Sequence, residues 1–267
     1  MAPVGSQELE FAVGAAREAG AITLRYFQDA ALAVDTKADG SPVTRADREA
    51  ERLLRERIGE AYPADGILGE EEGEHIGESG RVWILDPVDG TKSFARGVPL
   101  YGTMIGLEEN GQAVLGVVYF SALREMMFAA RGCGAWWLRD IGGDEQRVPA
   151  RVSEVSELGR ALLCVTSVGS FVHAGEITLY AALRGVTGLD RGWSDCYGHM
   201  LVATGRADVH VDPWMNVWDC AALQPIVEEA GGSFTDLAGN ATHRGGSGVS
   251  TNAALRDAVL AITGVGR

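Results

Sequence analysis

Hydrophobic positions recur at helical spacing near the start of the chain and predict an amphipathic helix over residues 9–27. These positions are Leu9, Val13, Ala16, Gly20 and Phe27. A second amphipathic helix is expected over residues 45–60, because Thr44 and Asp47 have the spacing of a capping box in front of an apolar stripe. The chain therefore opens with two helices that each bury one face.

The next part of the chain has the alternation and the turn residues of a β-sheet. Residues 64–80 are rich in glycine and acid and predict an exposed loop. Asn110-Gly111 predicts a tight hairpin. Strands are expected over 82–85, 101–107, 113–119, 126–129 and 135–138. The first half is thus interpreted as an α+β region with helices packed on an antiparallel meander.

The pattern changes after a polar segment at residues 139–154. Strands are expected over 161–166, 209–211 and 232–235, and helices over 175–183, 197–204, 217–230 and the C-terminal end. This alternation is typical of α/β proteins. We divide the chain near residue 145, into an α+β region (1–145) and an α/β region (146–267). Pro225 is expected to leave the Ala221 carbonyl without a helical partner and to kink its helix.

Composition narrows the class of partner. Of 267 residues 46% are hydrophobic, and 23 basic against 37 acidic residues give a formal charge of −14. Such a charge disfavours nucleic acid and favours cations. No apolar run reaches the roughly 20 residues of a membrane span, and the N-terminus does not resemble a secretion signal, so we expect a cytoplasmic protein that does not enter a membrane. The four cysteines are expected to be buried thiols, and the five histidines show no paired spacing typical of metal ligands.

The segment WILDPVDGTKSF, residues 83–94, changes from an apolar run to two acids. Pro87 lacks a backbone N–H and disfavours helix for Asp86, so the strand is expected to end at Asp86. Two carboxylates as close as Asp86 and Asp89 repel each other, and a bound divalent cation such as Mg²⁺ would remove that penalty. The alternative is an ordinary turn, in which both acids and Gly90 serve only the turn geometry.

Other residues point to the same chemistry. Thr91 and Lys92 lie where a helix could begin, and the free N–H groups of a helix start favour an anion. Acids also occur at residues 70–72 and, beside Trp218, at Asp219. Their alternatives are a solvated acidic loop and an acid in a first helical turn. Together the segments predict a metal and a phosphate group at one place.

Four motifs carry a resemblance to a known family. They are KADGSPVTRAD (37–47), GEE (69–71), WILDPVDGTKSF (83–94) and VWDCAA (217–222). In order and spacing they resemble the inositol monophosphatase superfamily of magnesium-dependent, lithium-sensitive phosphatases, from about residue 9 to the C-terminus. The resemblance implies a layered αβαβα fold and an active site that binds two to three Mg²⁺ ions. It also implies that lithium inhibits the enzyme. The implied ligands are Glu70, Asp86 and the Val88 carbonyl for one ion, Asp86, Asp89 and Asp219 for the second, and Glu70 for a looser third.

The resemblance also implies how phosphate and water are held. Gly90 and Thr91 would bind phosphate through their amides, and the Thr91 hydroxyl, paired with Asp47, would orient the attacking water. The implied catalytic residues are thus Glu70, Thr91 and Asp47, and metal-activated water would attack phosphorus in line. Asp47 has an alternative duty as a helix cap. Lys37 is interpreted either as shielding the site or as a solvated surface lysine.

The substrate is expected to be selected by residues 191–219. The stretch WSDCYGHMLVATGRAD is similar to the GDCYGYLLVATGRAD pattern of bacterial histidinol-phosphate phosphatases in this family, with Ser194 in place of a glycine. L-histidinol phosphate has an ammonium group and an imidazole, which Asp195 and Asp212 could pair with. Trp193 could form an apolar or cation–π wall. The predicted substrate contacts are Asp89, Trp193, Asp195, Asp212 and Asp219.

These assignments have alternatives. Asp195 could instead cap the following helix, and Trp193 could pack in the core. The substrate could be inositol 1-phosphate or a broad range of small phosphate esters. A metal-binding protein without turnover is the alternative outside the enzymes. The resemblance suggests a homodimer acting on a small phosphate ester.

Overall fold

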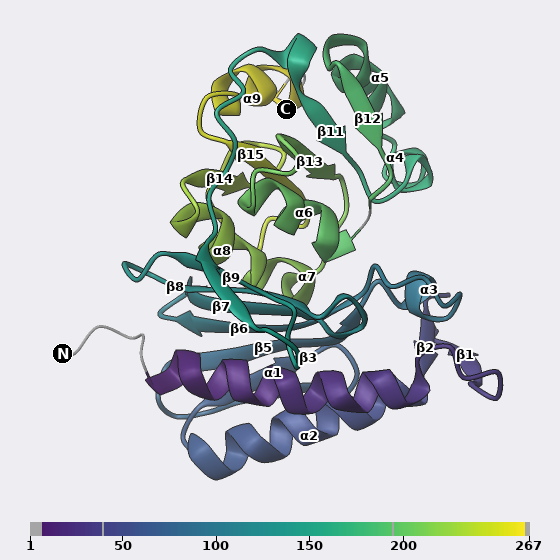
Figure 1. The fold of residues 1–267 in the computed structure, drawn as a ribbon, viewed down its shortest axis with the longest axis vertical. Coiled ribbons are helices and arrows are strands. Elements are labelled where there is room, and N and C mark those ends of the chain that lie inside the picture. Colours follow the sequence, from purple (N-terminus) through teal and green to yellow (C-terminus); the bar gives the residue numbers. More distant parts are fainter. Residues whose placement is uncertain (1–6, 39, 194, 265–267) are drawn as a thin grey trace.

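Two long helices cover one face of the first β-sheet (Figure 1). The computed structural model describes residues 7–38, 40–193 and 195–264. Helix α1 (Gln7–Tyr26) and helix α2 (Arg45–Ala61) confirm the two predicted helices. The capping box at Thr44 and Asp47 is formed. Both helices pack their apolar faces on the sheet, with Leu54 and Ile58 of α2 fully buried.

The first sheet is the predicted meander with three strands added, β3 (Gly66–Gly69), β4 (Gly73–His75) and β10 (Gln146–Pro149). Its order is β10, β9 (Ala135–Arg139), β8 (Glu125–Ala130), β7 (Gln112–Phe120), β6 (Gly102–Glu109), β5 (Arg81–Asp89), β3 and β4. Neighbouring strands are antiparallel except β3 and β5, which are parallel. Asn110 and Gly111 have φ of 52° and 77° and form the predicted hairpin turn. Because β10 pairs with β9, this sheet extends past residue 145, and the division of the chain there stays a prediction.

Two predictions in this sheet are wrong. Residues 64–80 are not one exposed loop, because β3 runs through them and Gly66, Ile67 and Gly69 are buried. A Cβ on Gly69 would lie 2.1 Å from the Glu51 carboxylate, so this glycine permits close packing on α2 rather than a loop. Strand β5 does not end at Asp86 but continues to Asp89, with Pro87 at an irregularity in the pairing with β6.

A middle layer of helices lies between the two sheets. It contains α6 (Asp195–Ala203), α7 (Val217–Ala221) and α8 (Leu223–Glu229). The predicted helix over 217–230 is broken at Ala222, in agreement with the kink expected from Pro225. A Cβ on Gly116 of β7 would lie 2.0 Å from the Ala222 carbonyl oxygen, so only a glycine at this position lets the helices pack this closely on the sheet. Helix α7 contacts both β5 and β6 of this sheet.

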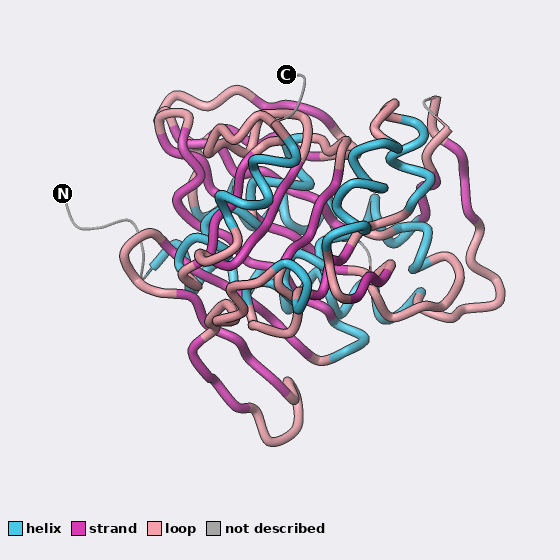
Figure 2. Tube along the Cα trace, turned by 90° about the horizontal axis from the view of Figure 1, so that it is seen from above, coloured by secondary structure: helices cyan, strands magenta, loops and turns pink. Residues whose placement is uncertain are grey.

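The second sheet has the order β12 (Leu189–Arg191), β11 (Leu162–Cys164), β13 (Val209–Asp212), β15 (Gly248–Asn252) and β14 (Gly232–Thr235). Its far face carries α4 (Val168–His173), α5 (Ile177–Val186) and α9 (Arg256–Thr263), packed through a separate apolar cluster. The layered αβαβα fold is therefore confirmed, and Figure 2, which looks along the long axis, shows helices and strands overlapping as stacked layers do.

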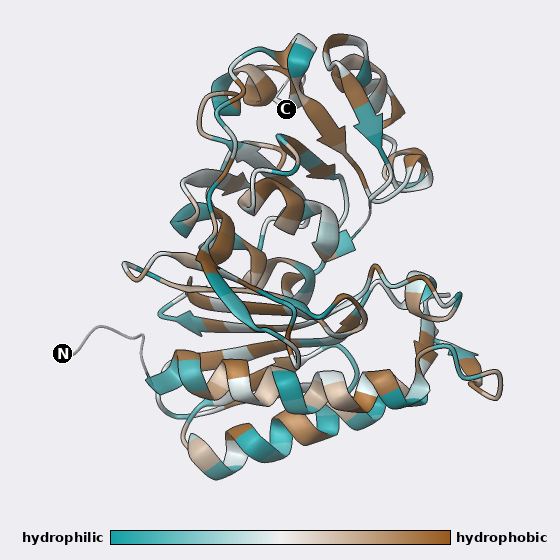
Figure 3. Ribbon diagram, viewed as in Figure 1, coloured by the Kyte–Doolittle hydropathy of each residue, from teal (hydrophilic) through white to brown (hydrophobic). Residues whose placement is uncertain are grey.

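Short elements complete the chain. They are β1 (Val34–Thr36), β2 (Pro42–Thr44), α3 (Thr91–Phe94) and two single 3₁₀ turns, Ser121–Leu123 and Leu158–Arg160. Figure 3 shows α1 and α2 with hydrophilic residues interspersed along their lengths. Within the described ranges, no helix combines the length and the apolar character that crossing a membrane would require. Cys133 is exposed, contrary to the prediction, while the other three cysteines are buried and all four are free thiols.

Candidate active site

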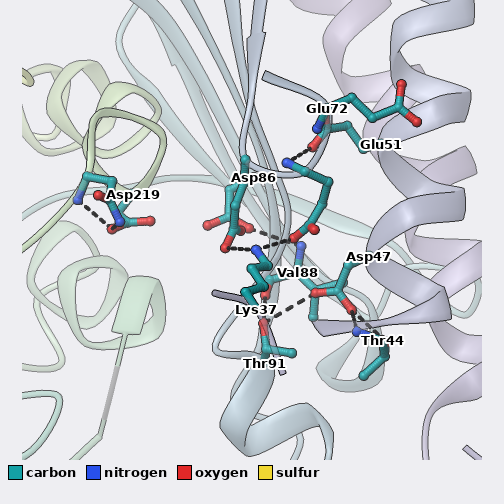
Figure 4. A network of polar contacts seen from close by, with 12 residues as sticks. Lys37, Thr44, Asp47, Glu51, Glu72, Asp86, Val88, Thr91 and Asp219 are labelled. Atoms are coloured by element: carbon teal, nitrogen blue, oxygen red, sulfur yellow. Dashed lines mark hydrogen bonds and ion pairs between the residues drawn. The ribbon is translucent and has the colours of Figure 1, made fainter. Parts of the chain in front are cut away.

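A cavity of about 340 Å³ opens where β5 ends, α3 begins and α7 begins. Eight of the predicted site residues line it: Glu70, Asp86, Val88, Asp89, Gly90, Thr91, Asp195 and Asp219. We call it the acid cavity. Figure 4 shows that Asp219 approaches Asp86 from the C-terminal half of the chain, whereas the other labelled residues come from the N-terminal half.

The irregularity in β5 brings Asp86 and Asp89 together. Side chains alternate along a regular strand, so residues three apart point to opposite faces. Here Asp86 pairs with Met104 and Asp89 with Gly102, so three steps on β5 face two steps on β6. The extra residue turns both carboxylates to one side. The Thr103 hydroxyl donates to the Pro87 carbonyl at 2.9 Å and holds this irregular segment in place.

Asp219 is positioned by the start of α7. The Asn216 backbone N–H donates to Asp219 Oδ2 at 2.7 Å, and Asn216 and Asp219 form a capping box. The Asn-x-x-Asp spacing in the sequence is a signal for this cap. The cap fixes one carboxylate oxygen, and the side chain faces the end of β5.

The three aspartates form a cluster that suits a divalent cation. Carboxylate oxygens of Asp86, Asp89 and Asp219 all lie within 4.8 Å of one another. Burial, followed by the charges of Glu70, Asp89 and Asp219, raises the pKa of Asp86 well above its ordinary value. Burial and nearby acids likewise raise the pKa of Asp89 and of Asp219, the latter to about 7. Oxygen ligands that repel one another at a half-buried position fit Mg²⁺, which would compensate their charge.

Glu70 lies at the wall of the acid cavity and is paired with a lysine. Lys37 Nζ donates to Glu70 Oε1 at 2.7 Å and to Glu71 Oε1 at 2.6 Å. Of the two interpretations of Lys37, the structure supports the one in which it acts on the site, since its ammonium neutralises part of the acidic charge. The backbone N–H groups of Glu71 and Glu72 donate to the buried Glu51 carboxylate, which fixes the turn that carries Glu70.

Gly90 and Thr91 begin the short helix α3 directly after β5. Gly90 has φ of 83°, and a Cβ there would lie 2.8 Å from the Leu100 carbonyl oxygen, so only glycine fits without strain. The N–H groups of a first helical turn have no partner within the helix. Gly90, Thr91 and Lys92 line the same cavity as the three aspartates, where an anion could accept from such N–H groups.

Asp47 reaches the site through Thr91. The Thr91 hydroxyl lies 2.9 Å from the Val88 carbonyl and 3.3 Å from Asp47 Oδ1, and both can accept its hydrogen. The other oxygen of Asp47 accepts from the Thr44 backbone N–H at 2.8 Å. Asp47 therefore both caps helix α2 and pairs with Thr91, the two contacts that the sequence predicted for it. Burial raises the pKa of Asp47, against the hydrogen bonds from Thr44.

The start of α6 is joined to the acid cluster. The Cys196 backbone N–H donates to Asp89 Oδ2 at 2.6 Å. Asp195 has φ of 53°, which is strained for a residue with a side chain. A Cβ on Gly90 would lie 3.3 Å from Asp195 Oδ2, so this carboxylate lies over the Gly90 turn. Asp195 is the first residue of α6 and lies in the wall of the acid cavity, and its alternative role as a helix cap stays a prediction.

Asp212 and Trp193 do not line the acid cavity, although Asp212 lines a small cavity together with Asp89 and Asp219. Asp212 is buried, and its oxygens accept from the Thr166 N–H and hydroxyl and face His210 Nε2 at 2.9 Å. Thr166 Oγ1 in turn accepts from the Asp195 N–H at 2.8 Å, so Asp212 supports Asp195 indirectly. Trp193 is 40% exposed rather than packed in the core. Contact of either residue with substrate stays a prediction, and Ser194 lies outside the described residues.

His199, His210 and Asp212 form a buried group that the sequence did not bring together. His199 Nδ1 pairs with Ser250 Oγ at 2.7 Å. Burial, followed by the neighbouring His210, lowers the pKa of His199 to about 4. Burial alone would raise the pKa of Asp212, but His210 and His199 hold it below its ordinary value. Spacing along the chain gave no signal, because the pair forms only when α6 packs on β13.

The buried His199 gives the folded protein a pH dependence. Between pH 6.5 and about 4 the unfolded chain binds a proton at this residue and the folded protein does not. This part of the stability is therefore fully present above pH 6.5 and is lost as the pH falls towards 4. We expect the free energy of unfolding, measured in urea over this range, to fall less in His199→Gln than in the unchanged protein. Equal pH dependence in both proteins would show that His199 is not its source.

A partly buried group of acids beside the start of a helix is an arrangement that could hold a metal ion and a phosphate ester. The chain belongs to the inositol monophosphatase family, whose model matches residues 6–263. It is 46% identical over 260 residues to a histidinol-phosphatase of Chlorobaculum parvum, covering 97% of both chains. It is 41% identical over 253 residues to a histidinol-phosphatase of Mycobacterium tuberculosis, covering 95% of this chain and 96% of that protein.

The fold has close counterparts among solved structures. The crystal structure of the extragenic suppressor protein suhB from Bartonella henselae superposes with a TM-score of 0.87 and 29% identity, covering 98% of this chain and 100% of that one. Since the relatives and the family are phosphatases, this protein is a phosphoric monoester hydrolase. The acid cavity is its candidate active site.

Proposed function

We propose that the protein is a magnesium-dependent phosphatase that hydrolyses L-histidinol phosphate to L-histidinol and phosphate, in histidine biosynthesis. The observation that carries the proposal is the position of Asp195, whose carboxylate lies over the Gly90 turn at the wall of the acid cavity. An ester whose phosphate accepts from the α3 amides would present its leaving group near this carboxylate, and histidinol carries an ammonium group next to the ester carbon. Relatives named histidinol-phosphatase support the same choice.

The residues of the chain have distinct parts in this reaction. The first N–H groups of α3 hold the phosphate, and the Thr91 hydroxyl with Asp47 orients a water towards phosphorus and holds its proton. Asp86, Asp89 and Asp219, with the Val88 carbonyl and Glu70, would hold Mg²⁺. When bound there, Mg²⁺ supplies positive charge that lowers the pKa of water and stabilises the leaving alkoxide. Asp195 pairs with the substrate ammonium and excludes a second anion.

A comparison of substrates tests the proposal. Phosphate release is measured at one magnesium concentration from histidinol phosphate, inositol 1-phosphate, fructose 1,6-bisphosphate and adenosine 3′,5′-bisphosphate. We expect the highest kcat/KM for histidinol phosphate, with a preference of at least tenfold, since a paired ammonium contributes about 1.5 kcal/mol or more. Higher kcat/KM for inositol 1-phosphate would replace this proposal by the inositol phosphatase alternative. Similar values for all four esters would indicate a phosphatase of broad specificity.

Other parts of the proposal rest on the family resemblance. They are the two to three Mg²⁺ ions per active site, inhibition by lithium, a homodimer and a cytoplasmic location. Substrate contacts from Asp89, Asp212 and Asp219 are proposed on the same basis.

A further inference from the structure

The acid cavity continues into a second cavity of about 400 Å³, which we call the outer cavity. Ser41, Lys92, Thr166 and Ser167 line both. The far end of the outer cavity is formed by His173, the last residue of α4, and by Trp214, in the segment between β13 and α7. The two cavities are therefore neighbouring parts of one cleft, and the outer one adds two aromatic rings to the acids of the inner one.

Trp214 and His173 present a ring surface to this cleft. Their centroids lie 5.1 Å apart with an interplanar angle of 35°. The Trp214 side chain is 58% exposed, although the backbone around it is well anchored. Pro213 restricts the chain before it, and the buried Met215 donates its N–H to the Gly246 carbonyl at 2.9 Å. A large indole held open to solvent on a fixed turn is available to stack on a ligand ring.

The charges along the cleft favour different parts of a substrate at different positions. The outer cavity has Lys92 and His173 in its wall, and none of the described residues that line it carries a carboxylate. A small cavity of about 80 Å³ is lined by Trp214 and by four aspartates, Asp89, Asp195, Asp212 and Asp219. A cationic ammonium therefore fits among these acids near Asp195, and a planar ring fits beside Trp214 in the outer cavity, where no described lining residue carries a carboxylate.

We propose that Trp214 and His173 form a ring-stacking subsite for the leaving group, which receives the imidazole while Asp195 pairs with the ammonium. The inference rests on the proposed function, because it concerns the same substrate. In histidinol phosphate a short carbon chain separates the ester oxygen from the imidazole and bears the ammonium between them. The order phosphate, ammonium, ring in this molecule matches the order α3 amides, Asp195, Trp214 along the cleft. The ring wall is thus assigned to Trp214 rather than to Trp193.

The test compares two esters that differ in the ring. Histidinol phosphate carries ammonium and imidazole, and 2-aminopropyl phosphate carries the ammonium alone. Trp214→Ala is expected to raise KM for histidinol phosphate about tenfold and to leave KM for 2-aminopropyl phosphate within about twofold, which is the size of a lost ring stack. Trp214→Phe should restore most of the affinity, and His173→Ala should raise the same KM to a smaller extent. Val172→Ala, a 62% exposed position next to His173 on α4, is the matched control and should change neither KM.

The outcomes separate this subsite from the proposed function. If Trp214→Ala changes KM for both esters equally, or for neither, the subsite is wrong. It is also wrong if Trp193→Ala, and not Trp214→Ala, produces the selective effect. The proposed function is judged on the unchanged protein alone, by its preference among the four esters above. A protein that prefers histidinol phosphate but is insensitive to Trp214→Ala would keep the function and lose the subsite.

Discussion

Replacement of Asp86 by asparagine is expected to lower kcat/KM about a thousandfold and to raise the magnesium concentration needed for half-maximal turnover. Asp86 is the most buried of the three clustered aspartates, 2% exposed, and is central to the proposed ligand set. An amide keeps the shape and removes one of the charges that would stabilise the transition state through the bound metal. The measurement is phosphate release against magnesium concentration. Wild-type turnover and magnesium dependence in this variant would contradict the assignment of the metal site.

The same replacement is expected to stabilise the protein when magnesium is absent. Asp86 is buried among like charges, and both burial and these charges raise its pKa and disfavour its ionised form. Removing the repulsion should increase the free energy of unfolding in EDTA by about 1–2 kcal/mol, as substitutions at strained functional sites do. Asp140→Asn is the matched control, because Asp140 is an exposed acid in the β9–β10 turn. The control should change neither turnover nor stability by a comparable amount.

Replacement of Thr91 by valine is expected to lower kcat about a hundredfold with little change in KM. Valine keeps the size and branching of threonine and removes the hydroxyl that bridges Asp47 and the Val88 carbonyl. Loss of water orientation and proton transfer commonly costs this factor or more. The measurement is kcat and KM for the preferred ester at saturating magnesium. An equal increase in KM with unchanged kcat would instead place the hydroxyl in substrate binding.

Thr103→Val is the matched control for this variant. Thr103 also donates its hydroxyl to β5, at Pro87, but it does not line the acid cavity. Both valine variants lose one hydrogen bond to the irregular part of β5. If the loss of activity in Thr91→Val came only from a loosened strand, Thr103→Val would show it too.

The sequence predicted the long elements because their patterns are strong and local. The apolar stripe and the cap at Thr44 located α2, and Asn110-Gly111 located the hairpin of β6 and β7. The misinterpreted region was residues 64–80, where Gly66 and Gly69 were read as loop residues. They are strand residues whose missing side chains make room for α2 and β4, and only the packed neighbours reveal that.

The acidic residues of the site could be predicted from the sequence, but the hydrogen bonds that hold them in place could not. Glu70, Asp86, Asp89, Thr91 and Asp219 are recognisable from their motifs, and the structure gathers all five at one cavity. The links through Thr166 and Cys196 join positions that lie far apart in the chain, so no spacing rule could find them. Trp214 lies in the same segment of the sequence as Asp212 and Asp219, but its exposure at the cleft depends on how the chain passes from β13 to α7.

The capping box between Asn216 and Asp219 has a consequence for how substrate range can change. Asp212, Trp214, Asn216 and Asp219 follow one another within eight residues, from the end of β13 to the first turn of α7. The ring wall at Trp214 is thus only two residues from the cap that orients a clustered acid. The side chain at position 214 can vary without moving that cap, whereas an inserted or deleted residue would shift Asp219 away from β5. In this segment, substrate selectivity can therefore change through substitutions but not through insertions or deletions.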